Sequence, residues 1–295
     1  MAGRERDSMP LRRAAGSVLG IVFATWLAGT GLAAEREDQP LWEIGAVAGG
    51  GWLPDYPAAG QNHVRALALP YAVYRGEIFR LGDRGAARGI VYDDQRLEFD
   101  LGLDAAFPVD SDDNDARRGM PNLDYLLELG PRLRYRLLPE PDGQELDASL
   151  AVRGVISTDF RNWRYQGVVI NPALAYRIRP FAGYDLHLVA SLSPFWGVDG
   201  LNKYFYEVKP RFERPDRPAY QADNGYIGTE LSLGASWGPW ERLRLFGGVQ
   251  VGYWKGSANE ESPLYREDFT VAVGGGLRVM LFRSERTVPR ARTEE

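Results

Sequence analysis

The sequence predicts an all-β protein, an antiparallel transmembrane β-barrel of about 12 strands that follows a signal peptide; a count of about 10 strands is the alternative. Three observations support this fold class. Long segments alternate apolar and polar residues, the N-terminus has the composition of an export signal, and short turns alternate with long loops along the chain.

Residues 124–137 carry the clearest alternation. Every second side chain from Tyr125 to Leu137 is apolar, and those between are charged or glycine, apart from Leu126. A period of two indicates a β-strand, because successive side chains leave a pleated backbone on opposite faces. Strands of globular proteins usually run about 5–6 residues. A strand more than twice that long, apolar on one face and charged on the other, is typical of a wall between lipid and a wet lumen.

The N-terminal segment, residues 1–34, is predicted to be a signal peptide. Arg12 and Arg13 precede a nearly uncharged apolar run over residues 14–32, and Ala33 and Ala34 offer small residues for cleavage. A membrane-anchoring helix is the alternative, since this run could almost span a bilayer. No later segment is apolar for about 18 residues, so we expect no further transmembrane helix.

The barrel is predicted to occupy residues 35–282, followed by a short charged tail at 283–295. Alternation or an apolar run bounded by turn residues marks its strands. The expected strands are 42–52, 67–73, 77–83, 88–92, 97–107, 124–137, 146–157, 168–178, 184–196, 227–237, 243–254 and 269–282. The segments 77–83 and 88–92 form two short strands or one bent strand, and this choice affects the strand count.

The connections between these strands fall into two classes. Short turns are expected at 93–95, 139–143, 179–183 and 238–241, and long loops at 54–63, 108–121, 197–225 and 256–267. Bacterial outer-membrane barrels have short turns on the periplasmic side and long loops outside. A chain that starts in the periplasm therefore places the acidic loop 108–121 outside the cell.

Charged residues on the polar faces of the strands are expected in the lumen. They are Arg96, Glu98, Asp100, Asp104, Asp124, Glu128, Arg132, Arg134, Arg136, Asp147 and Arg153. These side chains could line an open pore, or they could pair across strands and fill a narrow interior. We expect a filled or narrow lumen, because a barrel of about 12 strands lies between packed small barrels and open porins.

The acidic loop is the one stretch with a metal-binding pattern. Asp110, Asp112 and Asn114 are spaced like the start of a calcium-binding loop, and carboxylates and amides are oxygen ligands for calcium. Asp115 stands where such a loop needs glycine, however, and Pro121 stands where it needs glutamate. We therefore expect no metal site. Instead, Arg117 and Arg118 should neutralise part of the acidic cluster as the loop folds over the barrel mouth.

Composition argues against enzymatic and nucleic-acid functions. The chain has no cysteine, two histidines and a net charge of −5, and it carries no phosphate-binding loop or zinc motif. His187 shares the predicted polar face of its strand with Asp185, Ser191 and Ser193, but His-based catalysis needs contacts that spacing cannot establish. We expect no enzyme activity, no cofactor and no nucleic-acid partner.

Several segments resemble the MipA/OmpV family of outer-membrane proteins, which includes the MltA-interacting protein. The most specific is the stretch from Phe107 to Pro121, followed by Leu-Glu-Leu-Gly-Pro131. Its acidic loop contains Asp110, Asp112, Asp113, Asn114, Asp115, Arg117, Arg118 and Gly119. The other segments are Leu69-Pro-Tyr-Ala-Val-Tyr-Arg-Gly76, Gly82-Asp-Arg-Gly85, Lys203-Tyr-Phe-Tyr206, Asn224-Gly-Tyr226 and Leu281-Phe-Arg-Ser-Glu285.

The resemblance implies a non-enzymatic barrel in the cell outer membrane, surrounded by outer-membrane lipid. For the MltA-interacting member it implies a scaffold that joins a lytic transglycosylase to a murein synthase. Other members are linked with osmotic or stress responses and with adhesion. We therefore expect a scaffold or envelope-maintenance protein. The alternatives are a small-solute channel and a surface adhesin or stress-response, porin-like protein.

Overall fold

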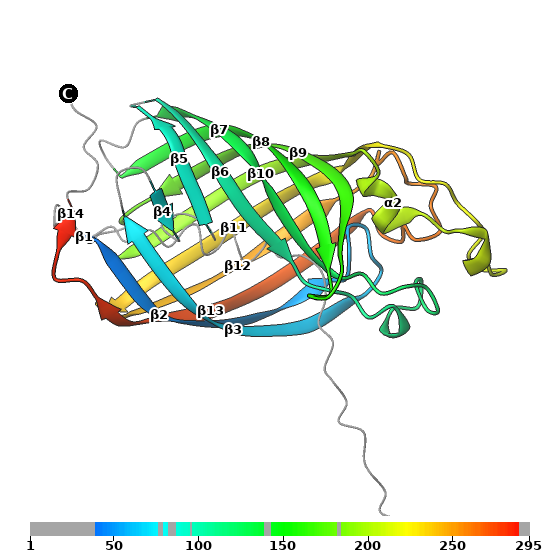
Figure 1. Cartoon of the computed structure of the whole chain (residues 1–295), viewed down its shortest axis with the longest axis horizontal. Coiled ribbons are helices and arrows are strands. Elements are labelled where there is room, and N and C mark those ends of the chain that lie inside the picture. The colour runs from blue at the N-terminus through cyan, green and yellow to red at the C-terminus, as the bar shows by residue number, and fades with distance from the viewer. Residues whose placement is uncertain are drawn as a thin grey trace, which may run out of the picture.

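The computed structural model describes residues 39–75, 79–81, 87–94, 96–138, 143–181 and 184–288. The predicted signal peptide lies outside these residues, as do the Gly82–Gly85 segment, most of the turn 139–143 and the end of the tail. The described chain forms one closed antiparallel barrel (Figure 1), with the strand order β10-β11-β12-β13-β2-β3-β4-β5-β6-β7-β8-β9. The predicted fold class is confirmed.

Ten of the barrel strands are long, at 10 to 16 residues each. They are β2 (Trp42–Pro54), β3 (Asn62–Arg75), β6 (Leu97–Ala106), β7 (Tyr125–Leu138), β8 (Gln144–Thr158), β9 (Trp163–Ile178), β10 (Leu186–Val198), β11 (Gly225–Trp240), β12 (Leu243–Tyr253) and β13 (Phe269–Arg283).

The remaining strands of the order, β4 (Phe79–Leu81) and β5 (Ala87–Asp93), are short. Among the described residues, β4 pairs with β3 only at Tyr74–Leu81 and Arg75–Arg80. The region 77–92, which the sequence left open between two strands and one bent strand, thus contributes two short elements between the long strands β3 and β6. Ten long strands and two short ones make up the wall.

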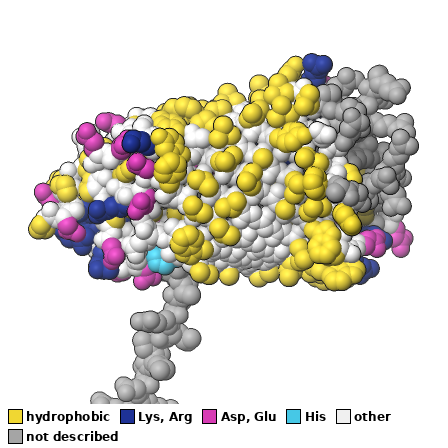
Figure 2. Space-filling view, turned by 180° about the vertical axis from the view of Figure 1, so that it is seen from behind, with side chains coloured by type: hydrophobic (Ala, Val, Ile, Leu, Met, Phe, Trp, Pro, Cys, Tyr) yellow, Lys and Arg dark blue, Asp and Glu magenta, His cyan; other side chains and the backbone are white. Residues whose placement is uncertain are grey.

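Each long strand separates lipid-facing from lumen-facing side chains. On β7, Leu129 is 59% exposed and Leu133 is 43% exposed, whereas the adjacent residues Glu128 and Arg134 are buried. Figure 2 shows hydrophobic side chains spread over the barrel wall, with charged side chains gathered at its loop end. This arrangement suits a bilayer, because a closed barrel leaves few backbone groups unpaired in hydrocarbon.

The barrel closes where β13 pairs with β2, and glycines face one another there. Gly49 lies opposite Gly276 and Gly50 opposite Gly275. A Cβ atom on Gly276 would lie 2.3 Å from the backbone oxygen of Ala48, so no larger residue fits without moving a strand. Pairing of β13 with β2 therefore requires glycine at this position.

The two ends of the barrel differ. At the short-turn end, β1 (Gln39–Pro40) and β14 (Thr287–Val288) pair outside the barrel (Figure 1). At the opposite end the long loops contain three short helices: η1 (Ser111–Asp113), α2 (Leu201–Tyr206) and η2 (Pro210–Phe212). None of the helices in the described residues has the length and apolar character needed to cross a membrane.

Candidate functional site

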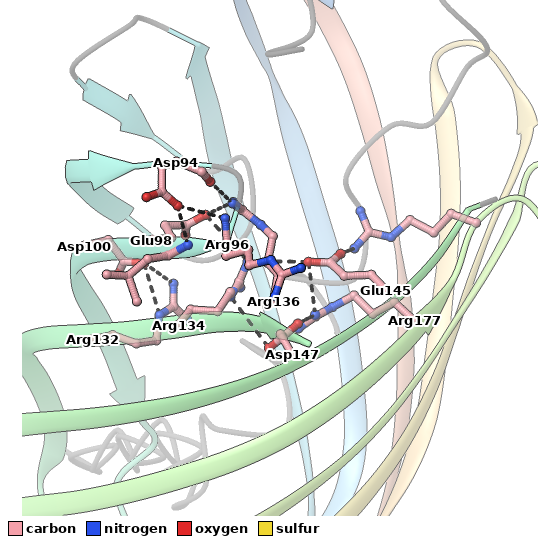
Figure 3. A network of polar contacts seen from close by, with 12 residues as sticks. Asp94, Arg96, Glu98, Asp100, Arg132, Arg134, Arg136, Glu145, Asp147 and Arg177 are labelled. Carbon is pink, nitrogen blue, oxygen red and sulfur yellow. Dashed lines mark hydrogen bonds and ion pairs between the residues drawn. The ribbon is translucent and has the colours of Figure 1, made fainter. Parts of the chain in front are cut away.

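Charged side chains from β6 to β9 form a network of ion pairs in the lumen near the short-turn end (Figure 3). The barrel register creates it, because residues of opposite charge lie directly across from one another: Asp100 faces Arg132 and Glu98 faces Arg134. The Nη2 atom of Arg132 lies 2.9 Å from Oδ2 of Asp100, and the Nη2 atom of Arg136 lies 2.8 Å from Oε2 of Glu98.

Arg134 lies at the centre of this network. It is buried, and its guanidinium lies 3.8 Å from Glu98, 3.9 Å from Glu145 and 3.7 Å from Asp147. Because burial removes the charge from water, a guanidinium here needs several carboxylates around it. The network therefore fills this end of the lumen with paired charge.

Three residues that were not among the expected lumenal charges complete the network. They are Glu145, Arg177 and Arg179. Arg179 donates from Nη2 to Oε2 of Glu145 at 3.0 Å, and Arg177 pairs with Asp147. Glu145 lies at the start of β8, Arg177 lies at the end of β9, and Arg179 follows directly after β9. At these positions the apolar run that marks each strand begins or stops. Their alternation in phase with Asp147 was the signal that could have identified them.

A second group of charges lies farther toward the mouth. Arg153 donates from Nε to Oε2 of Glu128 at 3.0 Å, and its Nη1 atom lies 3.8 Å from Oδ2 of Asp104. The structure thus brings nine of the expected lumenal residues into ion pairs. They are Glu98, Asp100, Asp104, Glu128, Arg132, Arg134, Arg136, Asp147 and Arg153.

Arg96 borders this network in Figure 3 through its backbone N–H, which donates to Asp94, and Asp124 lies toward the other end of the barrel. Arg96 is exposed and donates to the hydroxyl of Tyr135, an outward-facing residue, because Arg96 precedes the first residue of β6 and is not held by the strand alternation. Asp124 precedes β7 and lies at the mouth, where its backbone N–H donates to the hydroxyl of Tyr204 at 2.6 Å. Neither side chain belongs to the lumenal network.

The long loops fold together over the mouth and bury a hydrophobic core. Its side chains come from every long loop and from the strand ends beneath them, and include Leu53, Tyr56, Met120, Leu201, Phe205, Trp254 and Leu264. We call this assembly the loop cap. Burial of side chains from separate loops in one cluster stabilises a single closed arrangement.

Asp55 is the polar centre of the loop cap, and sequence reasoning missed it. Its fully buried carboxylate lies 2.7 Å from Nδ1 of His63, and it accepts hydrogen bonds from Nη2 of Arg65 and Nδ2 of Asn114, both at 2.7 Å. The last bond joins the first long loop to the acidic loop. A carboxylate between Pro54 and Tyr56 in an otherwise apolar loop was the available signal.

Arg117 anchors the acidic loop from within. Its guanidinium is buried, donates to the backbone oxygens of Phe205 and Pro121, and lies over the ring of Tyr56 at 5.7 Å. Burial lowers the pKa of Arg117 and raises the pKa of Tyr56 to about 12. Arg118, in contrast, pairs with Asp115 in solvent. Arg118 thus neutralises part of the acidic cluster as expected, whereas Arg117 is turned toward backbone carbonyls beneath it.

The three candidate calcium ligands do not converge. Asp110 accepts from the backbone N–H of Asp112 and caps η1, Asp112 accepts from Gly119, and Asn114 donates to Asp55. In the described part of the chain, no group of three or more acidic, histidine or cysteine residues could hold a metal ion. Asp113 and Gly119 are exposed on the same loop.

His187 contacts no serine hydroxyl among the described residues. Its Nε2 atom lies 2.9 Å from Oδ1 of Asp185, and Arg244 donates to the other oxygen of that carboxylate at 2.6 Å. A nucleophile in contact with the base would be needed for acyl transfer. The geometry instead places the buried His187 side chain beside a half-buried carboxylate that also pairs with Arg244, near the short-turn end.

Comparison with solved structures gives distant matches. A bacterial polysaccharide outer membrane secretin is 10% identical, with a TM-score of 0.39, over 84% of this chain and 99% of its own. Outer membrane phospholipase A from Escherichia coli is 12% identical, with a TM-score of 0.34, over 87% of this chain and 98% of its own. None of the curated proteins matches the chain.

Comparison with family models gives a match that spans the barrel. The model described as MltA-interacting protein MipA matches residues 44–279. These residues run from β2 to β13 and include the lumenal charges, Asp55 and the acidic loop. The chain therefore belongs to the MipA family, and it is a β-barrel of the outer-membrane type.

Proposed function

We propose that this protein is a non-enzymatic, non-conducting barrel of the outer membrane that serves as a scaffold for murein-cleaving and murein-synthesising enzymes. The observation that carries the proposal is the membership of the MipA family, whose name states an interaction with MltA, a lytic transglycosylase. The geometry of the two barrel ends supports it.

The loop cap argues for a scaffold over a channel. Arg117, Tyr56 and Phe205 lie in contact above the lumen, and the charged side chains of β6 to β9 below them form ion pairs. An open pore needs a continuous water path lined by polar groups. A hydrophobic core across the mouth interrupts such a path.

The short-turn end is the face we assign to the periplasm, where murein enzymes act. Short turns of outer-membrane barrels lie on that side. The β1–β14 pair projects from this end, and a two-stranded sheet offers open edges to which a partner can add a strand (Figure 1). Partner binding is therefore proposed at β1–β14 and the neighbouring turns.

Topology is tested by cysteine labelling, because the chain has no native cysteine. Asp113 lies on the exposed surface of the acidic loop and Thr287 lies in β14. A membrane-impermeant maleimide should label Asp113→Cys in intact cells, and should label Thr287→Cys only after the outer membrane is permeabilised. The reverse pattern would remove the periplasmic scaffold surface.

Partner binding is tested by crosslinking with a purified lytic transglycosylase and a purified murein synthase. A photocrosslinker at Thr287 should capture both enzymes, and the same group at Asp113 should capture neither. Absence of capture from either position, together with no retention of the enzymes on immobilised barrel, would reject the scaffold role.

A further inference from the structure

A small cavity lies beneath the loop cap, and two carboxylates line it. Its volume is about 50 Å³, and its walls include Leu201 and Phe205 from α2, Phe195 from β10 and Trp254. Glu128 of β7 and Glu230 of β11 also line it. A single water needs about 10–15 Å³ by this kind of measure, so the cavity can take a molecule of about two to four heavy atoms.

Glu230 has no polar partner in the described part of the chain. It is 3% exposed, and no described hydrogen bond or ion pair reaches its carboxylate. The barrel register holds it there, since it lies opposite Ser193 of β10 and Gly252 of β12. On the same inner face, Gln250 is 2% exposed, and neither polar atom of its amide has a hydrogen-bond partner in the described residues.

The charges around the cavity do not balance. Arg153 is the cation of this group, and it is shared between Glu128 and Asp104. Glu230 adds a third carboxylate with no guanidinium of its own. An isolated ionised carboxylate in an apolar site is very unfavourable, and that cost is removed either by protonation or by a bound cation. The site therefore favours a positively charged ligand.

The lining selects the kind of cation. Calcium and magnesium need about six oxygen ligands, and the wall here is mostly aliphatic and aromatic. The indole of Trp254 packs against the inner faces of Gly228 and Gly252, where a Cβ atom would lie within 2.3 Å of its ring. An aromatic ring and a carboxylate that line one cavity suit an alkylated ammonium, whose carbon atoms tolerate the apolar wall.

We propose that this cavity binds a small organic cation of the alkylammonium class, with its ammonium group against the Glu230 carboxylate and its alkyl group against Trp254 and Phe205. The inference does not depend on the scaffold role. It assigns the lumen a ligand-binding function at a site that lies between the ion-pair network and the loop cap.

The test measures binding of radiolabelled methylammonium to the full-length barrel folded in detergent micelles, by equilibrium dialysis at neutral pH and constant ionic strength. We expect one saturable equivalent that ethylammonium displaces and that potassium or methanol does not. The variant Glu230→Gln should bind at least tenfold more weakly. The matched control is Glu241→Gln, which removes an exposed carboxylate that pairs with Arg283 and should bind like the wild type.

A second variant keeps the test decisive if Glu230→Gln fails to fold, as judged by heat-dependent gel mobility. Ala106 lines the same cavity, and Ala106→Leu should fill it while leaving Glu230 in place, so binding should be lost by exclusion. Absence of saturable binding to the wild type would overturn the proposal. So would displacement by potassium, or equal binding by either cavity variant.

Discussion

At the scale of single residues, the loop cap depends on a few buried polar groups more than on the exposed acidic cluster. Asp55 holds the side chains of His63 and Arg65 from strand β3 and of Asn114 from the acidic loop. Arg117 joins the acidic loop to α2 through the backbone oxygen of Phe205. Because these groups are out of water, removal of one partner costs much more than the loss of a surface ion pair.

We expect Asp55→Asn to loosen the loop cap. The change leaves the buried Arg65 guanidinium without its carboxylate, which typically costs about 3–5 kcal/mol. Trypsin should then cleave the folded variant after Arg118, and mass spectrometry should identify the fragment, while the wild type resists. The matched control is Asp216→Asn, an exposed partner of Arg214. Equal cleavage of all three proteins would show that Asp55 does not hold the cap.

We also expect strong alkali to open the loop cap. Burial raises the pKa of Tyr56 to about 12 from an unfolded value of 10.0. Its protonated hydroxyl therefore contributes fully to folding stability below pH 10, and this contribution is lost as the pH rises to about 12. A shift of this size corresponds to about 3 kcal/mol. Proteolysis of the acidic loop, measured from pH 8 to 12, should rise steeply in the wild type.

In the Tyr56→Phe variant, proteolysis of the acidic loop should rise less steeply over the same pH range, because the titrating hydroxyl is gone. The variant also loses the hydrogen bond from Tyr56 to the backbone oxygen of Leu264, so its protection should already be lower at pH 8. Identical pH profiles in the two proteins would assign the alkaline transition to other groups.

At the scale of elements, the closing pair β2–β13 is set by glycine. On the inner face, Gly276 lies near the backbone of Ala48 and the ring of Phe246. This allows the two strands and the aromatic ring to approach closely. The same residues that lower strand propensity elsewhere are therefore required at this position.

Gly276→Ala should impair barrel closure, since its Cβ atom would lie 2.3 Å from the backbone oxygen of Ala48. Overpacking of this kind usually costs about 1–3 kcal/mol. The fraction of heat-resistant, fast-migrating barrel on cold gels should fall. Gly102→Ala is the control, because the nearest atom to its Cβ lies 3.8 Å away. Equal loss in both variants would point to strand propensity instead of closure.

The alternation of apolar and polar residues predicted where the strands lie better than it predicted the residues at which they begin and end. Alternation in β7 identified the outward Leu129 and the inward Arg134, because side-chain direction in a strand is a local property. The expected strand 67–73 begins at Asn62 instead, since polar residues continue the strand where it meets the mouth. The helix α2 was expected to be loop, because six residues are too few for helix propensity to be visible without packing.

The candidate site was predictable only in part. The lumenal charges follow from alternation, but their partners depend on register, which links residues on different strands. The contact between Asp55 and Asn114 joins residues 59 positions apart, and no periodicity points to it. Glu230 belongs to a predicted strand, but its significance comes from the absence of a partner in the described structure.

At the scale of the whole molecule, the barrel is sealed at one end by the loop cap and filled toward the other by ion pairs. The cap covers the mouth with apolar side chains, and the network places ion-paired side chains in the lumen. Two different kinds of packing therefore close the same lumen.

In planar bilayers we expect the wild-type protein to give no steady conductance. Deletion of residues 110–120 should produce channel openings, because it removes Arg117, Met120 and the bond from Asn114 to Asp55. Correct folding of the deletion variant is checked by gel mobility. Steady conductance through the wild type would favour the small-solute channel, and silence of a folded deletion variant would show that the ion-pair network alone blocks the lumen.

The seam between β2 and β13 also constrains how the protein is made. The backbone N–H of Trp42 donates to the hydroxyl of Ser284, a residue 242 positions later in the chain. Until that late segment arrives, the first strand has no neighbour on one side and its backbone groups remain open to wrong partners. Synthesis and export must therefore be nearly finished before the barrel can close. A chain that ends before β13 therefore leaves one edge of β2 unpaired.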